Sequence, residues 1–169
     1  MAPVSLSVSI RHLFISPGHN FFGRHGQPAG DFPTNEVARV QCRAGRGLEG
    51  DRFYVYRPDY KGQITFFSWE TCESVKDAFR MPQLSPGVFR RNVVVEGMDL
   101  NALVGWRFSL AGVEFEGVVE SRPCHWMNAV VAPGAESWLQ GRGGLRAKIL
   151  TDGELAVGSA PLSLLEKVG

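Results

Sequence analysis

Paired cysteines are what this chain of 169 residues most clearly lacks. Its three cysteines, Cys42, Cys72 and Cys124, lie far apart, and no two of them form a Cys-x-x-Cys pair. A structural zinc site of the ribbon type needs such pairs, so we do not expect one. An odd number of widely spaced cysteines is also untypical of a disulfide framework and fits a reducing compartment, so we expect a cytoplasmic protein.

Long hydrophobic runs and an excess of one charge are missing as well. No apolar run approaches the roughly 18 residues needed to cross a bilayer, and the N-terminus has no basic region followed by an apolar block. The 18 basic and 17 acidic side chains leave a formal net charge of +1, so the basic stripe typical of nucleic-acid binding is absent. We therefore expect no secretory signal, no membrane partner and no nucleic-acid partner.

Period-2 alternation of apolar and polar residues is the dominant pattern that is present. Hydrophobic residues make up 44% of the chain, enough to bury a sizeable core in a single domain over 1–169. The alternating or β-branched segments are 4–10, 38–43, 63–67, 92–96, 106–110, 113–116, 145–149 and 155–157. Twenty glycines and ten prolines place turns between them. Short strands with frequent turns predict a mostly β fold, either a barrel or a sandwich.

Only a few helices are expected beside these strands. Ser68 can cap a helix over about 69–79, and a serine followed by proline opens a short helix over 86–90. A third helix over 133–140 would end before a glycine. Residues 16–35 are rich in glycine and proline and predict a long loop, of the kind that often serves as a lid or binding loop.

The segment with the most chemistry contains Cys124, which follows a proline and is flanked by Arg122 and His125. Cationic neighbours favour the thiolate, which is the form that attacks electrophiles and binds soft metals. From the spacing alone, a cysteine buried as a small hydrophobic residue is an equal alternative. Cys42 and Cys72 fall on the apolar faces of a predicted strand and a predicted helix, so we assign both to the core.

A glycine-rich segment with two arginines, Gly141–Arg146, follows about one short helix later. Its glycines allow close backbone approach, and its arginines pair well with phosphate. A soft ligand and an anion-binding loop together suggest a cofactor that carries both a metal and a phosphate. We expect Cys124 at the floor or rim of the largest polar pocket, with one of these arginines lining it. A zinc site of Cys124, His19 and His25 is a weaker alternative, because the spacing matches no standard pattern.

Five motifs occur in series between residues 36 and 160. They are Gly47–Arg52 (Gly-Leu-Glu-Gly-Asp-Arg), Arg91–Leu100, Leu103–Phe108, Arg122–Cys124 and Gly143–Gly153. In this order they resemble the MOSC domain, which is found at the C-terminus of molybdenum cofactor sulfurases. One departure from the family pattern is that the arginine of the second motif stands directly beside Asn92. The chain is similar to a small, stand-alone member of this family.

The resemblance implies a fold and a site. The fold would be mostly β (α+β), a closed or nearly closed β-barrel with a few peripheral helices. The family uses its single cysteine as a molybdenum ligand or a sulfur carrier, which makes Cys124 the metal ligand and catalytic residue and His125 a candidate acid–base group. In the family, basic and backbone groups hold the pterin phosphate, and the candidates here are Arg91, Asn92, Arg122, Arg142, Gly143, Gly144 and Arg146.

Three functions are compatible with these residues. The first is a molybdenum cofactor (Mo-pterin) domain in which Cys124 ligates the metal, acting as a reductase of N-hydroxylated compounds or as a cofactor-handling protein. The second is a sulfur carrier with a persulfide on Cys124. As an enzyme, the protein would be a molybdenum-dependent oxidoreductase in the first case and a sulfur transferase in the second. The third is a non-catalytic β module that binds a partner through 16–35.

The partners expected from these alternatives are small molecules and proteins. The small molecule would be a substrate or a cofactor, and the protein would be an electron donor or a sulfur donor. We expect no pyridoxal phosphate, because nothing in the sequence resembles a Schiff-base lysine site.

Overall fold

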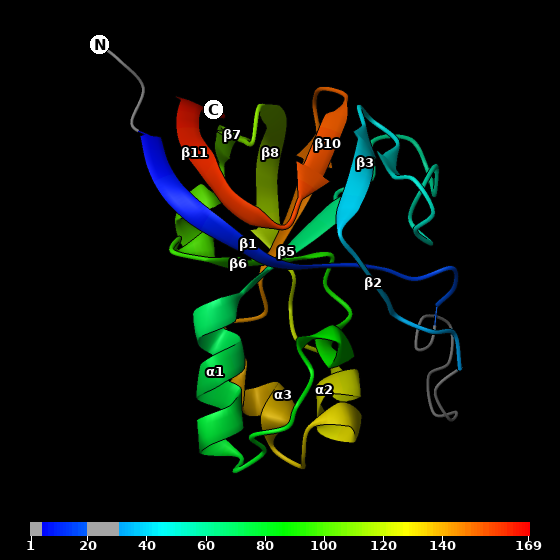
Figure 1. The fold of residues 1–169 in the computed structure, drawn as a ribbon, viewed down its shortest axis with the longest axis vertical. Coiled ribbons are helices and arrows are strands. Elements are labelled where there is room, and N and C mark those ends of the chain that lie inside the picture. The colour runs from blue at the N-terminus through cyan, green and yellow to red at the C-terminus, as the bar shows by residue number, and fades with distance from the viewer. Residues whose placement is uncertain (1–4, 20–30) are drawn as a thin grey trace.

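Seven strands close into a β-barrel in the computed structural model, which describes residues 5–19 and 31–169 (Figure 1). Around the barrel the strands follow the order β1 (Ser5–Ile15), β11 (Gly158–Lys167), β7 (Trp106–Leu110), β8 (Val113–Glu120), β9 (Leu145–Ile149), β5 (Ile64–Ser68) and β6 (Val93–Glu96). β1 pairs with β6 on one side and with β11 on the other, which closes the ring. The predicted mostly β fold and closed barrel are confirmed, and 18% of the structure is helical.

The alternation along the strands decides which side chains fill the barrel. On β7, Phe108 and Leu110 are buried, whereas Arg107, which precedes Phe108, is exposed. Phe66 of β5, Phe108 and Phe115 of β8 contact one another with ring centroids 5.5 to 5.9 Å apart. Aromatic pairs at such distances stabilise a core beyond the area that they bury. The barrel interior is therefore a packed core and not a channel.

Strands β5 and β6 are buried on both faces, because helices cover their outer side. They run parallel, with Phe66 opposite Val93, and parallel neighbours need a crossover connection, which is supplied here by α1 (Trp69–Ala78). Phe66 belongs to the barrel core, whereas the adjacent Phe67 and Val94 belong to a second hydrophobic cluster under the helices. Two-sided burial explains why these strands have nearly continuous apolar sequences where the others alternate.

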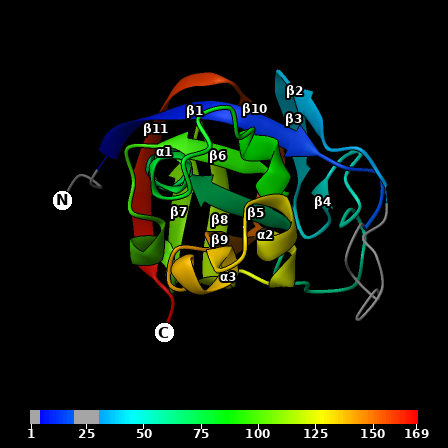
Figure 2. The ribbon, with the colours of Figure 1, turned by 90° about the horizontal axis from the view of Figure 1, so that it is seen from below.

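A layer of short helices covers one end of the barrel (Figures 1 and 2). It contains α1, α2 (His125–Val130) and α3 (Ala135–Trp138), while the 3₁₀ helices are η1 (Pro86–Phe89) and η2 (Leu100–Leu103). The side chain of Ser68 accepts the Thr71 N–H at 3.2 Å and caps α1, so the helix predicted over 69–79 is confirmed. The helix predicted over 86–90 is the 3₁₀ turn η1, and only 135–138 of the predicted helix over 133–140 is helical. The sequence did not predict α2.

A smaller sheet and the N-terminal loop flank the barrel. The sheet consists of β10 (Gly153–Ala156), β3 (Arg39–Arg43) and β4 (Gly47–Leu48). β2 (Asn35–Val37) pairs antiparallel with the end of β1. Of the predicted loop over 16–35, residues 16–19 and 31–34 have no regular structure, and residues 20–30 lie outside the described part of the chain. Among the described residues, no helix is long and apolar enough to span a membrane.

Candidate functional site

Cys124 lies on the short connection between the end of β8 and the start of α2, and its side chain is exposed. The other two cysteines are buried, Cys42 in the barrel core and Cys72 in the cluster under the helices. Burial raises the pKa of both thiols to about 12. Cys124 is therefore the only one of the three whose sulfur is open to a ligand or reagent.

Arg91, at the start of β6, fastens the connection that carries Cys124 to the neighbouring glycine-rich loop. Its guanidinium donates hydrogen bonds to the carbonyl oxygens of Ser121 (3.0 Å) and Arg122 (3.4 Å) on one side and Gly143 (3.0 Å) on the other. A fourth bond goes to the carbonyl of Phe89 at 3.2 Å. Because one guanidinium bonds to both loops, Arg91 fixes their positions relative to each other.

The charge of Arg91 also acts on Cys124. Burial lowers the pKa of Arg91 to about 10, and among the charged neighbours Cys124 is the one that opposes this shift most. The effect requires the thiol and the guanidinium to lie within electrostatic range of each other.

Gly143 and Gly144 bring the two loops into backbone contact. A Cβ on Gly143 would lie 2.1 Å from the Ser121 carbonyl oxygen, and a Cβ on Gly144 would lie 2.1 Å from the Phe66 carbonyl oxygen. The Gly143 N–H donates to a carboxylate oxygen of Glu120 at 3.1 Å, and the Gly144 carbonyl accepts the Ser121 N–H at 2.8 Å. The structure gives both glycines a packing role, and phosphate binding by their amides stays a prediction.

Asn92 is likewise occupied by the fold. It is 3% exposed, and its side-chain oxygen accepts both the N–H and the hydroxyl of Thr65 at 3.0 Å. Its side-chain nitrogen donates to the Phe14 carbonyl at 3.0 Å. These bonds join β1, β5 and the start of β6, so any contact of Asn92 with a cofactor also stays a prediction.

A basic pocket of about 90 Å³ opens beside the two loops. Its lining residues are Arg52, Phe53, Tyr60, Gly62, Thr65, Arg90, Arg91, Ser121 and Arg146. Of the arginines predicted as cofactor ligands, Arg91 and Arg146 are brought together here. Sequence reasoning missed Arg52 and Arg90, although Arg52 ends the first of the five motifs and Arg90 stands next to Arg91.

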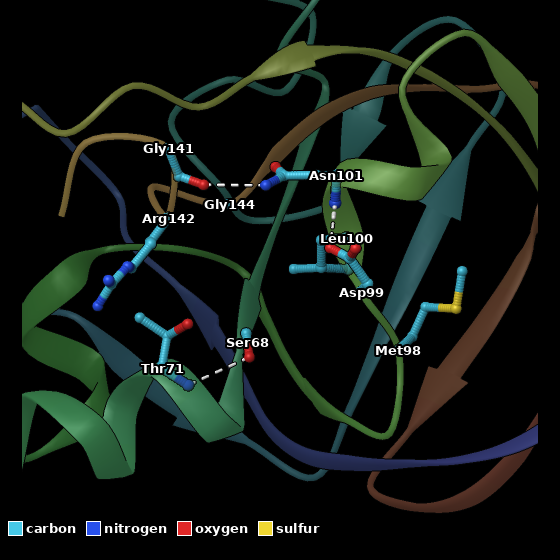
Figure 3. Close-up of a pocket in the computed structure, with 9 residues that line it drawn as sticks. All are labelled: Ser68, Thr71, Met98, Asp99, Leu100, Asn101, Gly141, Arg142 and Gly144. Atoms are coloured by element: carbon cyan, nitrogen blue, oxygen red, sulfur yellow. Dashed lines mark hydrogen bonds between the residues drawn. The ribbon is translucent and has the colours of Figure 1, made fainter.

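The other two predicted arginines lie elsewhere. Arg142 lines a separate cavity of about 160 Å³ between α1, η2 and the glycine-rich loop (Figure 3). There its guanidinium lies 4.3 Å from the centre of the Trp138 ring, and Asn101 donates to the Gly141 carbonyl at 2.9 Å. Arg122 is exposed and lines neither cavity. The four arginines therefore do not converge on one ligand position.

Cys124 lines none of the cavities found among the described residues, so its place at the largest polar pocket stays a prediction. The largest of these, about 380 Å³, is lined by Trp126 and Arg90 among others but not by Cys124. Cys124 is absent from the lining of the basic pocket too, although Arg91 and Ser121 take part in it. Ser121, three residues before it, does line the basic pocket, while Cys124 itself is exposed.

The histidines among the described residues belong to no metal cluster. His125 is exposed as the first residue of α2. His19 packs edge-on against Phe53 at 4.8 Å, and burial together with the nearby Arg52 lowers its pKa. His25 lies outside the described residues, and within those residues no three His, Cys, Asp or Glu side chains are grouped to hold a metal ion.

The fold and the site together define a β-barrel domain with an exposed thiol beside a basic pocket. A family model described as MOSC domain matches residues 25–160, and the chain belongs to the MOSC domain family. A search of curated protein sequences finds no relative.

Three solved structures illustrate the shared fold. The YUAD protein of Bacillus subtilis superposes with a TM-score of 0.74 at 18% identity, over 98% of this chain and 100% of that one. YiiM of Geobacillus stearothermophilus gives 0.66 at 16% identity, over 94% of this chain and 75% of that one. YiiM of Escherichia coli gives 0.66 at 17% identity, over 99% of this chain and 72% of that one.

Proposed function

We propose that this MOSC domain binds a molybdenum cofactor and that Cys124 ligates the metal. The observation that carries the proposal is the exposed thiol of Cys124 on a connection clamped by the half-buried cation Arg91, next to a basic pocket. A soft anionic sulfur suits molybdenum, and basic groups suit the phosphate that the cofactor carries.

The residues present fit such a group chemically. Cys124 supplies the soft donor, and Arg122 and Arg146 supply guanidinium groups with no hydrogen bond or ion pair to the described residues. The pterin body would have to lie along the surface, because the basic pocket of about 90 Å³ is far smaller than the roughly 300 Å³ of pockets that enclose drug-sized ligands.

Each of these residues has a distinct role in the proposal. Cys124 binds the metal, Arg91 positions the connection that carries Cys124, and the free arginines hold phosphate. His125, exposed beside the thiol, would give or take a proton at its imidazole during turnover. The bound cofactor would supply two-electron oxygen-atom chemistry, which fits a reductase of N-hydroxylated compounds, and the same binding residues would serve a cofactor-handling protein.

Elemental analysis of the purified protein tests the proposal. Protein from a molybdenum-replete host is expected to contain stoichiometric molybdenum, and Cys124→Ser to lose it, because a hydroxyl is a hard and weakly acidic ligand. Cys72→Ser is the matched control, since its thiol is buried in the hydrophobic cluster under the helices and should leave the loading per folded molecule unchanged. Molybdenum that survives Cys124→Ser at full occupancy would contradict the assignment.

A second candidate, a sulfur carrier, is favoured by the accessibility of Cys124 to another protein. Its thiolate would attack the terminal sulfur of a donor persulfide, forming a new S–S bond while the donor cysteine leaves as a thiolate. Intact mass spectrometry separates the two functions. An added mass of about 32 Da, one sulfur atom, on Cys124 without bound molybdenum supports the carrier.

A further inference from the structure

A cavity of about 160 Å³ lies between α1, η2 and the glycine-rich loop, and Cys124 does not line it. Two of its lining residues carry opposite charges. Asp99 stands just before η2, and Arg142 belongs to the glycine-rich loop. Figure 3 shows them on opposite sides of the cavity. The cavity therefore presents an anion and a cation to the same space.

These two charges are not neutralised by each other or by their neighbours. Neither Asp99 nor Arg142 forms an ion pair with any residue that the structure describes. Other exposed charges of this molecule do pair, as Arg43 does with Glu49 at 2.6 Å. A cation and an anion that share a cavity without pairing can both be satisfied by one ligand that carries the two complementary charges.

The guanidinium of Arg142 is held in place without using its hydrogen-bond donors. It lies 4.3 Å from the centre of the Trp138 ring, and its side chain makes no hydrogen bond with any described residue. A guanidinium carries its N–H donors in one plane, and contact with an aromatic face leaves them available. A carboxylate, which is also planar, can accept two of these N–H groups side by side.

Asp99 keeps one carboxylate oxygen for a ligand. Its Oδ1 accepts the Asn101 N–H at 3.0 Å and caps η2, while Oδ2 has no hydrogen-bond partner among the described residues. The side-chain nitrogen of Asn101 donates to the Gly141 carbonyl at 2.9 Å, and its side-chain oxygen makes no bond within the same residues. An ammonium group has donors for both of these free oxygens.

The size and the walls of the cavity limit the ligand. A volume of about 160 Å³ has room for about five water molecules at roughly 30 Å³ each. Met98 and Leu100 supply an apolar wall, which suits a short side chain beside the charged groups. We infer that the cavity binds a small free α-amino acid as the zwitterion, with its carboxylate on Arg142 and its ammonium on Asp99. This site is separate from the one proposed for the molybdenum cofactor.

Titration of the full chain with glycine, L-alanine and L-serine, followed by NMR, tests the inference. The backbone amide signals of Thr71, Asn101 and Gly141 should shift saturably with at least one of these amino acids, with a dissociation constant of about 1 mM. The N-acetyl form of that amino acid lacks the ammonium group, and its methyl ester lacks the carboxylate. Each should bind at least about fivefold more weakly, because a charge-assisted contact is lost.

The variants Arg142→Gln and Asp99→Asn remove the two charges one at a time. Asparagine caps helices as well as aspartate does, so η2 should stay capped in Asp99→Asn. Each variant should weaken binding at least about fivefold. The matched controls Arg39→Gln and Glu154→Gln remove an exposed cation and an exposed anion that pair with each other outside the cavity, and should change the affinity less than about twofold. Thermal melting checks that all four variants are folded.

Amide shifts that rise linearly without saturation, or equal affinities for the amino acid and its two blocked forms, would overturn the inference. So would losses in the control variants as large as those in Arg142→Gln and Asp99→Asn. The titration needs neither molybdenum nor Cys124. Its failure therefore leaves the proposed function unaffected, and a failure to load molybdenum leaves the amino-acid site unaffected.

Discussion

At the scale of single residues, exposure separates Cys124 from the other two cysteines. Cys42 is 0% exposed and Cys72 is 1% exposed, and burial raises the pKa of both. Their thiols are neither reachable nor ionised at neutral pH. Among the three cysteines, only Cys124 is therefore within reach of a reagent or a ligand from solution.

Alkylation with iodoacetamide tests this restriction. In the native protein we expect one cysteine to react at pH 8, and peptide mapping should place the label on Cys124. In urea all three should react, because unfolding exposes Cys42 and Cys72. Labelling of a second cysteine in the native state, at a rate similar to that of Cys124, would show that the core is more open than described.

Arg91 is the residue on which the placement of Cys124 depends most. Replacing it by methionine removes the donors for four carbonyl oxygens and leaves some of them buried without a partner. We expect Arg91→Met to lower the free energy of unfolding by at least about 3 kcal/mol in urea titrations.

Arg122→Met is the matched control for this change. Arg122 is exposed and its side chain makes no hydrogen bond to the described residues, so its loss should alter stability by less than about 0.5 kcal/mol. Similar effects of the two substitutions would mean that the clamp contributes little to stability.

At the scale of elements, the glycine-rich loop is shaped by close packing more than by ligand binding. Gly141 and Gly144 both have positive φ, 79° and 101°, but only Gly144 has a neighbour, the Phe66 carbonyl, in the space that a Cβ would fill. A substitution at Gly141 therefore tests backbone strain alone, and one at Gly144 tests backbone strain together with steric contact.

Alanine substitutions measure these two effects. Gly141→Ala should cost about 1 kcal/mol of unfolding free energy, from the left-handed backbone alone. Gly144→Ala should cost about 1–3 kcal/mol more, because the new methyl group forces β5 and the loop apart. Equal losses in denaturant titrations would mean that the loop relaxes freely away from β5.

At the scale of the whole molecule, the two hydrophobic cores make stability depend on alkaline pH. The thiols of Cys42 and Cys72 stay protonated in the folded state up to about pH 12, whereas in the unfolded chain they ionise near 9.0. Above pH 9 the unfolded state therefore binds fewer protons than the folded state. Stability contributed by the protonated thiols is present below pH 9 and is lost as the pH rises toward 12.

Urea unfolding at pH 8 and pH 9.5 measures this loss. We expect the unfolding free energy to fall by about 1.5 kcal/mol between the two pH values through the two thiols together. The double variant Cys42→Ala/Cys72→Ala is less stable at both pH values, because it leaves cavities, but should lose less on going to pH 9.5. An identical loss in wild type and variant would assign the alkaline effect to other groups.

Much of the barrel could be predicted from local pattern. Alternation identified β7, β8 and β9, and the capping serine identified α1, because side-chain direction and helix capping depend on neighbours within a few residues. The closing strand β11 was missed. It contains Pro161, a register shift near its end and few buried residues, so little in its own sequence distinguishes it from a loop.

The sequence by itself determined the fold class and the family, and it predicted Cys124 as the reactive cysteine. These rest on short-range pattern, on motifs in series and on the polar, cationic neighbours of Cys124. Tertiary structure alone decided that β11 closes the barrel, that Arg91 and the glycines serve as clamp and spacer, and that Arg142 lies apart from Arg146. It also brought Arg52, Arg90 and Arg146 to one pocket. The physical reason is that burial and charge depend on strands that are distant in the chain, and β1 and β11, from opposite ends of the chain, must pair before these side chains can meet.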